Sequence, residues 1–304
     1  MTRLNLMFNT RVCPWQALLL ALVLIPGGAY ARVPKAQPVV LVVEENHSFE
    51  SVIGQPAMPF LNELASRYGL AMRYYANAHP SLPNYFWLSA GQPVTFNDNT
   101  RETFDVDNLV RHLQVAGKTW KAYAESLPHA GYTGYNVYPY VKRHNPFAYF
   151  RDVASSHERN NIVPFSQFTT DVRADRLPDF VFIVPNQLHN GHDASLAAAD
   201  QWLKGALTPL LNTPAFKPGG RGLLVITFDE SFAKDCRPAH CGTSAHASGG
   251  RVATVLIGPR IRHSFRSFKT YRHENLLRTV CDAFGFGSCP GRGGSAKPLG
   301  DFFR

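Results

Sequence analysis

The chain has 304 residues, of which 45% are hydrophobic and 17% charged, an ordinary globular composition that can bury one large core or two smaller ones. Its formal net charge is +9, but the basic residues are scattered and form no Lys/Arg run, which argues against a specific nucleic-acid-binding segment. The charge permits an anionic partner, such as a phospholipid or a phosphorylated small molecule, without identifying it.

Residues 1–31 have the pattern of a signal peptide. Two arginines precede an apolar run at 17–26, and Ala29 and Ala31 form a small-x-small cleavage site. The apolar run is too short to span a membrane comfortably. We therefore expect an exported protein, periplasmic or secreted, with no transmembrane segment in a mature chain of residues 32–304. Without the two arginines this chain keeps 29 basic and 22 acidic residues, a net charge of +7.

Apolar runs alternate with helical patterns along the rest of the chain. Strands that alternate with helices predict an α/β fold with a mostly parallel sheet covered on both faces. Residues 122–170 are rich in Tyr, Pro, Asn and His and weakly periodic, which predicts an irregular insertion in a single domain, 32–304. The apolar runs begin at Val39, Phe180, Gly222 and Val252, and the helical patterns cover 58–69, 107–118 and 197–211.

Four cysteines lie in the mature chain. Because disulfides form in exported proteins, we expect the short-range pairs Cys236 with Cys241 and Cys281 with Cys289. The alternative, a zinc site, lacks paired CxxC spacing and companion histidines.

Polar side chains follow three of the predicted strands. Glu44, Glu45 and Asn46 come after the first, His189, His192 and Asp193 lie in the loop after the second, and Asp229 and Glu230 end the third. In open parallel sheets, ligands bind outside the carboxyl ends of the strands. We therefore expect a shared metal site at this edge. A helix N-cap role would explain Asp229 but not the matching pair on the first strand.

One divalent metal ion, either Ca, Zn, Mg or Mn, suits these oxygen donors. The expected metal ligands are Glu45, Asn46, Asp229 and Glu230. Ser81, in "HPSLPNY", is the candidate nucleophile and a further ligand, because it precedes a helical run whose N-terminus favours an anion. The alternative for Ser81 is an ordinary N-cap.

Two histidines are candidate catalytic and substrate-binding residues. His192 is next to Asp193, which would orient its ring, and His144 follows two basic residues and would contact a phosphate oxygen or protonate a leaving group. His79, His189 and His246 also lie in polar surroundings, whereas His273 begins a helical pattern and is expected to be structural.

Five motifs, in order, carry a family resemblance. They are "ENHSFE" from Glu45, "HPSLPNY" from His79, "KRHNPFAYF" from Lys142, "VPNQLHNGHD" from Val184 and "VITFDES" from Val225. The chain resembles, from about residue 38 to 286, the bacterial phosphoesterase family of secreted acid phosphatases and non-specific phospholipases C, in the alkaline-phosphatase superfamily.

The resemblance implies a three-layer α/β/α sandwich, alkaline-phosphatase-like, with one metal held by the residues named above. It also implies a hydrolase that attacks phosphorus with Ser81, forms a phosphoserine intermediate and uses His144 and His192 on the phosphoryl or leaving group. Two positions depart from the family pattern. Asn190 stands where an Asp is common, which leaves the role of that Asp open. Arg251 follows Gly249-Gly250 where a wider-superfamily His is common, so we expect a single metal and an Arg251 contact with phosphate.

The sequence leaves the substrate open. A phosphate monoester, as in an acid phosphatase, is the first expectation, because no C-terminal lipid-binding module is evident. A phospholipid headgroup, as in phospholipase C, is the alternative. A non-catalytic exported phosphate-binding protein is the alternative of another class, and a sulfatase-like esterase lacks its Cys/Ser-x-Pro-x-Arg signature. The oligomeric state is open.

Overall fold

The computed structural model describes residues 1–2, 32–232 and 248–304. Most of the expected signal peptide, the expected Cys236–Cys241 pair and His246 therefore lie outside the described residues. Within the described ranges, none of the helices combines the length and the apolarity needed to cross a bilayer.

An eight-stranded sheet forms the centre of the described chain. Its strand order is β4-β3-β5-β1-β6-β7-β2-β8. β7 pairs antiparallel with both of its neighbours and the other pairs are parallel, as expected for a mostly parallel sheet. The strands are β1 Val39–Glu44, β2 Gly69–Tyr74, β3 Trp120–Ala124, β4 Ile162–Pro164, β5 Phe180–Val184, β6 Leu223–Phe228, β7 Thr254–Ile257 and β8 Phe265–Tyr271.

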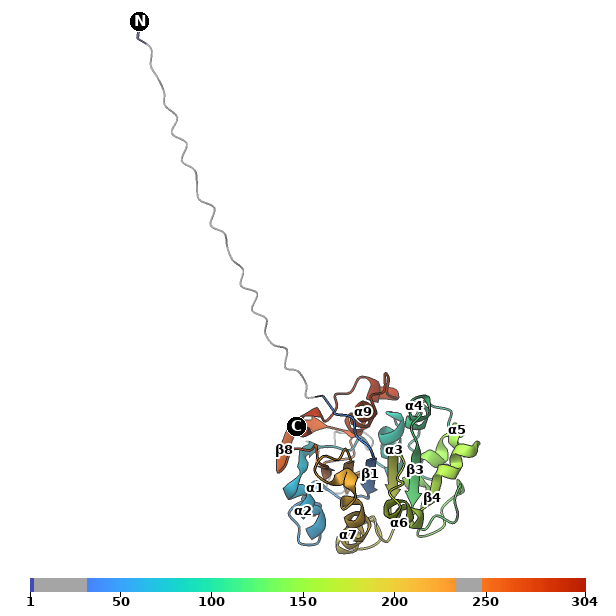
Figure 1. Cartoon of the computed structure of the whole chain (residues 1–304). Coiled ribbons are helices and arrows are strands. Elements are labelled where there is room, and N and C mark those ends of the chain that lie inside the picture. The colour runs from blue at the N-terminus through green and yellow to red at the C-terminus, as the bar shows by residue number, and fades with distance from the viewer. Residues whose placement is uncertain (3–31, 233–247) are drawn as a thin grey trace.

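Helices cover both faces of this sheet, which gives the predicted three-layer sandwich (Figure 1). Helix α7 packs against both α2 and α6 on one side, and α3 packs against α9 on the other. The helices are α1 Phe49–Val52, α2 Pro59–Arg67, α3 Ser81–Ala90, α4 Leu109–Val115, α5 Arg151–Ala154, α6 Ser166–Arg173, α7 Leu196–Leu211 and α9 His273–Phe284.

The central strands bring two acidic segments to one edge. All residues of β1, β5 and β6 are buried, as their continuous apolar runs predict. β1 and β6 run in register, with Glu44 opposite Phe228, so both strands end together. The next residues along each strand, Glu45 and Asp229, therefore leave the sheet side by side.

Helix α3 is buried on every side, which is unusual for a helix that covers a sheet. Every residue of α3 is buried, including Ser81 at its start. It ends at Gly91 in the left-handed region (φ 66°), where a Cβ atom would lie 2.3 Å from the carbonyl oxygen of Pro290. Burial on all sides fixes the helix, and with it the position of the candidate nucleophile.

The segment 122–170 is more regular than predicted. It completes β3, adds β4 to the sheet and begins α6, while short 3₁₀ turns and the four-residue α5 occupy the part between them. The irregular insertion is thus confined to about residues 125–161. Strands β2, β3, β4 and β8 were not predicted from the sequence. β4 has only three residues, and most of β8, at the sheet edge, is exposed or half-buried and so lacks an apolar run.

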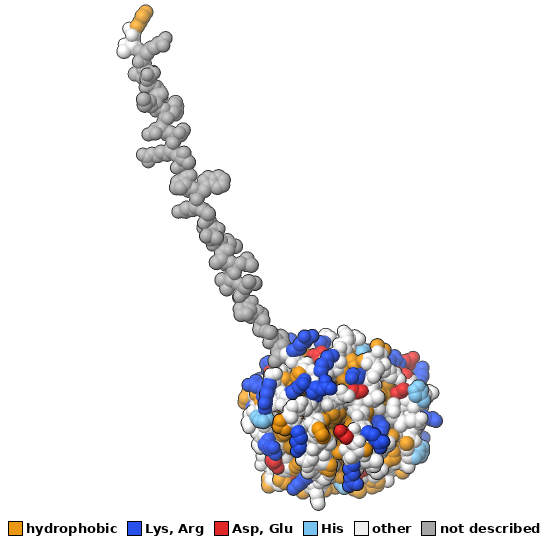
Figure 2. All heavy atoms as spheres, viewed as in Figure 1, with side chains coloured by type: hydrophobic (Ala, Val, Ile, Leu, Met, Phe, Trp, Pro, Cys, Tyr) orange, Lys and Arg blue, Asp and Glu red, His pale blue; other side chains and the backbone are white. Residues whose placement is uncertain are grey.

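Basic side chains are spread over the visible face of the molecule and do not gather in a single patch (Figure 2). This agrees with the scattered Lys and Arg residues of the sequence.

The predicted disulfide between Cys281 and Cys289 is present, between the end of α9 and the loop that follows it. Its two cysteines are 8 positions apart, and closing a loop of that length in the unfolded chain is worth about 2.5 kcal/mol. We expect the double variant Cys281→Ala/Cys289→Ala to lose about that free energy of unfolding in urea titrations. An unchanged midpoint of urea unfolding under oxidising conditions would show that the disulfide does not contribute to stability.

Candidate active site

Ser81 lies between two buried carboxylates that come from different strands. Its Oγ atom is 3.0 Å from Glu230 Oε1 and 3.2 Å from Glu45 Oε2. Glu45 follows β1 and Glu230 follows β6, so the expected meeting of strand ends occurs. The hydroxyl is engaged by carboxylates and caps no backbone group of its helix, so the simple N-cap alternative for Ser81 is wrong.

The first turn of α3 is fixed by Asn84. Its Oδ1 accepts the backbone N–H groups of Asn77 and Ala78, and its Nδ2 donates to the carbonyl groups of Ala78 and Pro80. The Asn of "HPSLPN" therefore ties the preceding loop to the helix and places Ser81 between them.

Asp229 organises the turn after β1. Its Oδ1 accepts the backbone N–H of Asn46 at 3.0 Å and that of Glu230 at 2.6 Å. Asn46 has φ 59°, a left-handed conformation that Asn tolerates better than most residues. Asp229 thus holds the second strand end against the first, and an N-cap role for it is wrong within the described residues.

His144 is buried and contacts Glu45. Its Nε2 lies 2.9 Å from Glu45 Oε1, and its ring stacks on Tyr85 with centroids 5.3 Å apart. The Nδ2 group of Asn190 lies 3.4 Å from its Nδ1. An amide donor there favours the tautomer with the proton on Nε2, the ring nitrogen that lies close to Glu45. Asn190, which departs from the family pattern, thus orients His144.

Tyr85 and His79 are site residues that the sequence reasoning missed. The Tyr85 hydroxyl donates to Glu45 Oε1 at 2.7 Å, and His79 Nδ1 contacts Glu230 Oε2. Tyr85 is four residues after Ser81, one helical turn along the same face, so the helical period could have indicated it. His79 was considered for its polar surroundings, but nothing in the sequence linked it to Glu230.

His192 has the partner that its sequence neighbour suggested. Its Nδ1 lies 2.6 Å from Asp193 Oδ1, and its backbone N–H donates to Asn190 Oδ1. The side chain is 33% exposed, so substrate can reach it. Asn190, which accepts from this backbone, also lies 3.4 Å from His144, so the loop that carries His192 borders the site.

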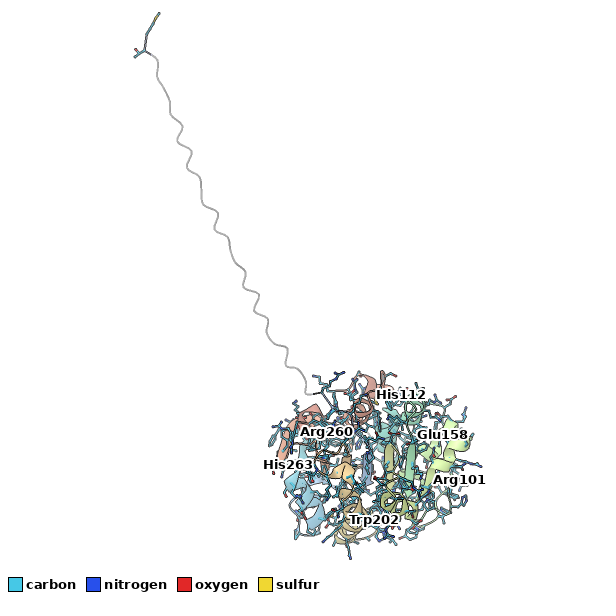
Figure 3. All side chains as sticks on the ribbon, viewed as in Figure 1. Arg101, His112, Glu158, Trp202, Arg260 and His263 are labelled. Carbon is cyan, nitrogen blue, oxygen red and sulfur yellow. A yellow bond between two sulfur atoms is a disulfide. The ribbon has the colours of Figure 1, made fainter. Side chains whose placement is uncertain are left out.

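His189 and Glu44 belong to the opposite face of the sheet. His189 Nδ1 contacts Glu125, which also accepts from Trp202 of α7 (Figure 3). Successive residues of a strand point to opposite faces, so Glu44 faces this side while Glu45 faces Ser81. Burial and the charge of Glu45 raise the pKa of Glu44 well above its ordinary value.

His273 is structural, as expected. It is fully buried at the start of α9, its Nδ1 contacts the Tyr74 hydroxyl and its Nε2 contacts the Asp229 carbonyl oxygen at 2.7 Å.

Arg251 is engaged away from Ser81. Its guanidinium donates to Glu50 Oε1 at 2.6 Å and to the Met72 carbonyl oxygen at 2.9 Å, and it stacks over Phe49. These contacts hold it beside β2, and no contact in the described chain links it to the nucleophile.

Three buried carboxylates meet near Ser81, where the sequence predicts a divalent cation. No set of three or more His, Cys, Asp or Glu side chains within the described residues forms a complete metal site, so the cation stays a prediction. Burial and the charge of Glu45 raise the pKa of Asp229 well above its ordinary value, and burial raises that of Glu230 despite the His79 contact. Three buried carboxylates repel one another unless a cation compensates them. Asp229 Oδ2 is buried and has no hydrogen-bond partner among the described residues. That oxygen, with those of Glu45 and Glu230, is what a hard cation would bind.

Comparisons with known proteins identify relatives of this chain. The model of the Phosphoesterase family matches residues 55–287. The phosphatidylinositol-3-phosphatase of Mycobacterium tuberculosis is 31% identical over 279 residues, which cover 91% of this chain and 86% of that protein. A probable acid phosphatase of Kluyveromyces lactis is 32% identical over 84% of this chain, and phospholipase C A of M. tuberculosis is 26% identical over 67%. The chain spans only 58% and 46% of these last two relatives.

The fold has similar solved structures as well. A protein in the alkaline phosphatase superfamily from Vibrio parahaemolyticus superposes with a TM-score of 0.54 over 84% of this chain and 68% of that one, at 12% sequence identity. This similarity confirms the predicted fold class, and the family match confirms the resemblance read from the five motifs. The chain belongs to the Phosphoesterase family.

Proposed function

We propose that this protein hydrolyses phosphate monoesters with Ser81 as nucleophile, beside a divalent cation held by Glu45, Asn46, Asp229 and Glu230, with Ser81 as a further ligand. The observation that carries the proposal is the Ser81 hydroxyl between Glu45 and Glu230 at the start of a buried helix. When bound, the cation would neutralise charge that develops on the phosphoryl oxygens.

The chain's own groups are arranged for acid–base work. The carboxylate of Glu230, 3.0 Å from Ser81 Oγ, is in position to take the hydroxyl proton as Ser81 Oγ attacks phosphorus. The bond to the leaving oxygen breaks, and His192, oriented through Nδ1 by Asp193, supplies a proton to the departing alcohol. His144, with its proton on Nε2, keeps Glu45 in place. Water then attacks the phosphoserine, releases phosphate and restores Ser81.

Cleavage of a monoester is favoured over the diester cleavage of a phospholipase C by the relatives with the higher identities, which are named as phosphatases. One of them is named as a phosphatidylinositol-3-phosphatase, so the monoester substrate can be a soluble compound or a phosphorylated lipid headgroup. Phospholipase C activity is the second candidate, supported by the 26% identical relative. A non-catalytic phosphate-binding role is the remaining alternative, and nothing in it requires a serine held by two carboxylates.

Hydrolysis of 4-nitrophenyl phosphate and of a phosphatidylcholine emulsion, each with Ca²⁺, Mg²⁺, Mn²⁺ or Zn²⁺, tests the proposal. We expect turnover of the monoester with at least one of these metals. Turnover of the emulsion alone would establish the phospholipase alternative. Phosphate binding without turnover of either would leave the non-catalytic role.

We also propose that the protein acts outside the cytoplasm. The signal-peptide pattern of residues 1–31 and the Cys281–Cys289 disulfide both support export.

A further inference from the structure

A phosphate monoester carries negative charge into a site that already holds Glu45, Asp229 and Glu230. A phosphoryl group at Ser81 therefore needs a side-chain cation in addition to the metal. The sequence suggested Arg251, but Glu50 and the Met72 carbonyl group already take up its guanidinium. The phosphoryl contact therefore requires another basic residue near the first turn of α3.

Asp98 contacts the first turn of α3. Its Oδ1 accepts the backbone N–H of Leu82 at 2.8 Å, directly after the nucleophile. Pro80, the N-cap of α3, makes no side-chain cap, so Asp98 supplies the negative charge that a helix N-terminus favours. Asp98 comes from the loop after α3, and this contact fixes the loop against the helix start.

Arg143 lies on the other side of Asp98. Its Nε is 3.8 Å from Asp98 Oδ2, an ion-pair distance that is too long for a hydrogen bond. No hydrogen bond of its guanidinium is found within the described residues. The side chain is 18% exposed and belongs to the 3₁₀ turn Lys142–His144, whose last residue contacts Glu45.

The position and the chemistry of Arg143 suit a phosphoryl group. A guanidinium stays charged at any pH of interest and offers a planar fork of donors that matches two phosphate oxygens. Arg143 forms an ion pair with Asp98 but donates no hydrogen bond to it, whereas Arg251 donates hydrogen bonds to Glu50 and to the Met72 carbonyl group. Asp98 links this guanidinium to Leu82, the residue after Ser81, and the next residue of the turn, His144, contacts Glu45.

We propose that Arg143 binds the phosphoryl oxygens of the substrate, and that Asp98 is a positioning residue that holds both Arg143 and the start of α3 in place. This inference rests on the proposed function, because it assigns the phosphoryl contact of that reaction to Arg143 in place of Arg251.

The test compares Arg143→Ala, Arg143→Lys and Arg251→Ala by 4-nitrophenyl phosphate kinetics and by the inhibition constant of inorganic phosphate. Loss of a charge-assisted bidentate contact should raise both KM and the phosphate inhibition constant by about tenfold to a hundredfold in Arg143→Ala. Arg143→Lys keeps the charge but not the fork and should fall between this variant and the wild type. Arg67→Ala, an exposed charge on α2, is the matched control and should change neither constant.

Asp98 is tested through the division between KM and kcat. Asp98→Asn keeps an oxygen acceptor for Leu82 but loses the charge that holds Arg143, so KM should rise severalfold while kcat is retained. Asp98→Ala removes both contacts and should lower kcat as well. If Asp98 has a purely structural role, both variants should instead have a lower melting temperature and the same KM as the wild type.

Unchanged KM and inhibition constants in Arg143→Ala, or an equal loss in Arg251→Ala, would overturn the inference while leaving the phosphatase activity intact. If the wild type turns over no phosphoester, the proposed function fails instead. Calorimetric titration of inorganic phosphate into the metal-loaded wild type and Arg143→Ala then still decides whether Arg143 binds phosphate.

Discussion

Replacing Ser81 by alanine should lower kcat for 4-nitrophenyl phosphate by a factor of about 1,000 or more, because no other group can form the phosphoserine. The phosphate inhibition constant should change much less than kcat, since the alanine leaves Arg143 and the other four expected metal ligands in place. Both constants are obtained from steady-state kinetics.

Ser89→Ala is the matched control for this variant. Ser89 is buried on the same helix, but its hydroxyl donates to the Tyr85 carbonyl oxygen and points to no carboxylate. We expect kcat to be retained in this control. Full turnover in Ser81→Ala would remove the serine from the mechanism and favour direct attack by a water molecule. A phosphorylated peptide containing Ser81, trapped by acid quenching and found by mass spectrometry, would identify the intermediate directly.

Removing the divalent cation with a chelator should abolish turnover and lower the melting temperature. Without a cation, the buried carboxylates of Glu45, Asp229 and Glu230 repel one another, and the binding free energy is lost from the folded state. A ligand at 100 times its Kd stabilises the fold by about 2.7 kcal/mol, so the shift should be several degrees. Metal analysis before and after chelation, with a thermal unfolding scan of each sample, measures both effects.

Adding back single metals should restore turnover and melting temperature together. Asp229→Asn should bind the metal weakly and behave like the chelated wild type, whereas Glu63→Gln, an exposed acid on α2, should keep a full metal content. A chelated wild type with full activity and no change in melting temperature would contradict the cation site.

The sequence alone determined much of the site because its key residues follow apolar runs. A continuous apolar run predicts a buried strand, and the end of the run marks where polar residues leave the sheet. Glu45, Asp229 and Glu230 were predicted in this way, and the structure brings them together at Ser81. The period of a strand likewise separates Glu45 from Glu44, which faces the other helix layer.

Only the tertiary structure decided which side chains complete the site. The sequence pointed to Arg251 as the phosphate contact, but contacts from distant segments engage Arg251 with Glu50 and leave Arg143 beside Asp98. His79 reaches Glu230 across 151 positions of the chain, a pairing that no local pattern encodes. Strand and helix periods are local properties of the backbone, whereas the partner of a charged side chain depends on how distant elements pack.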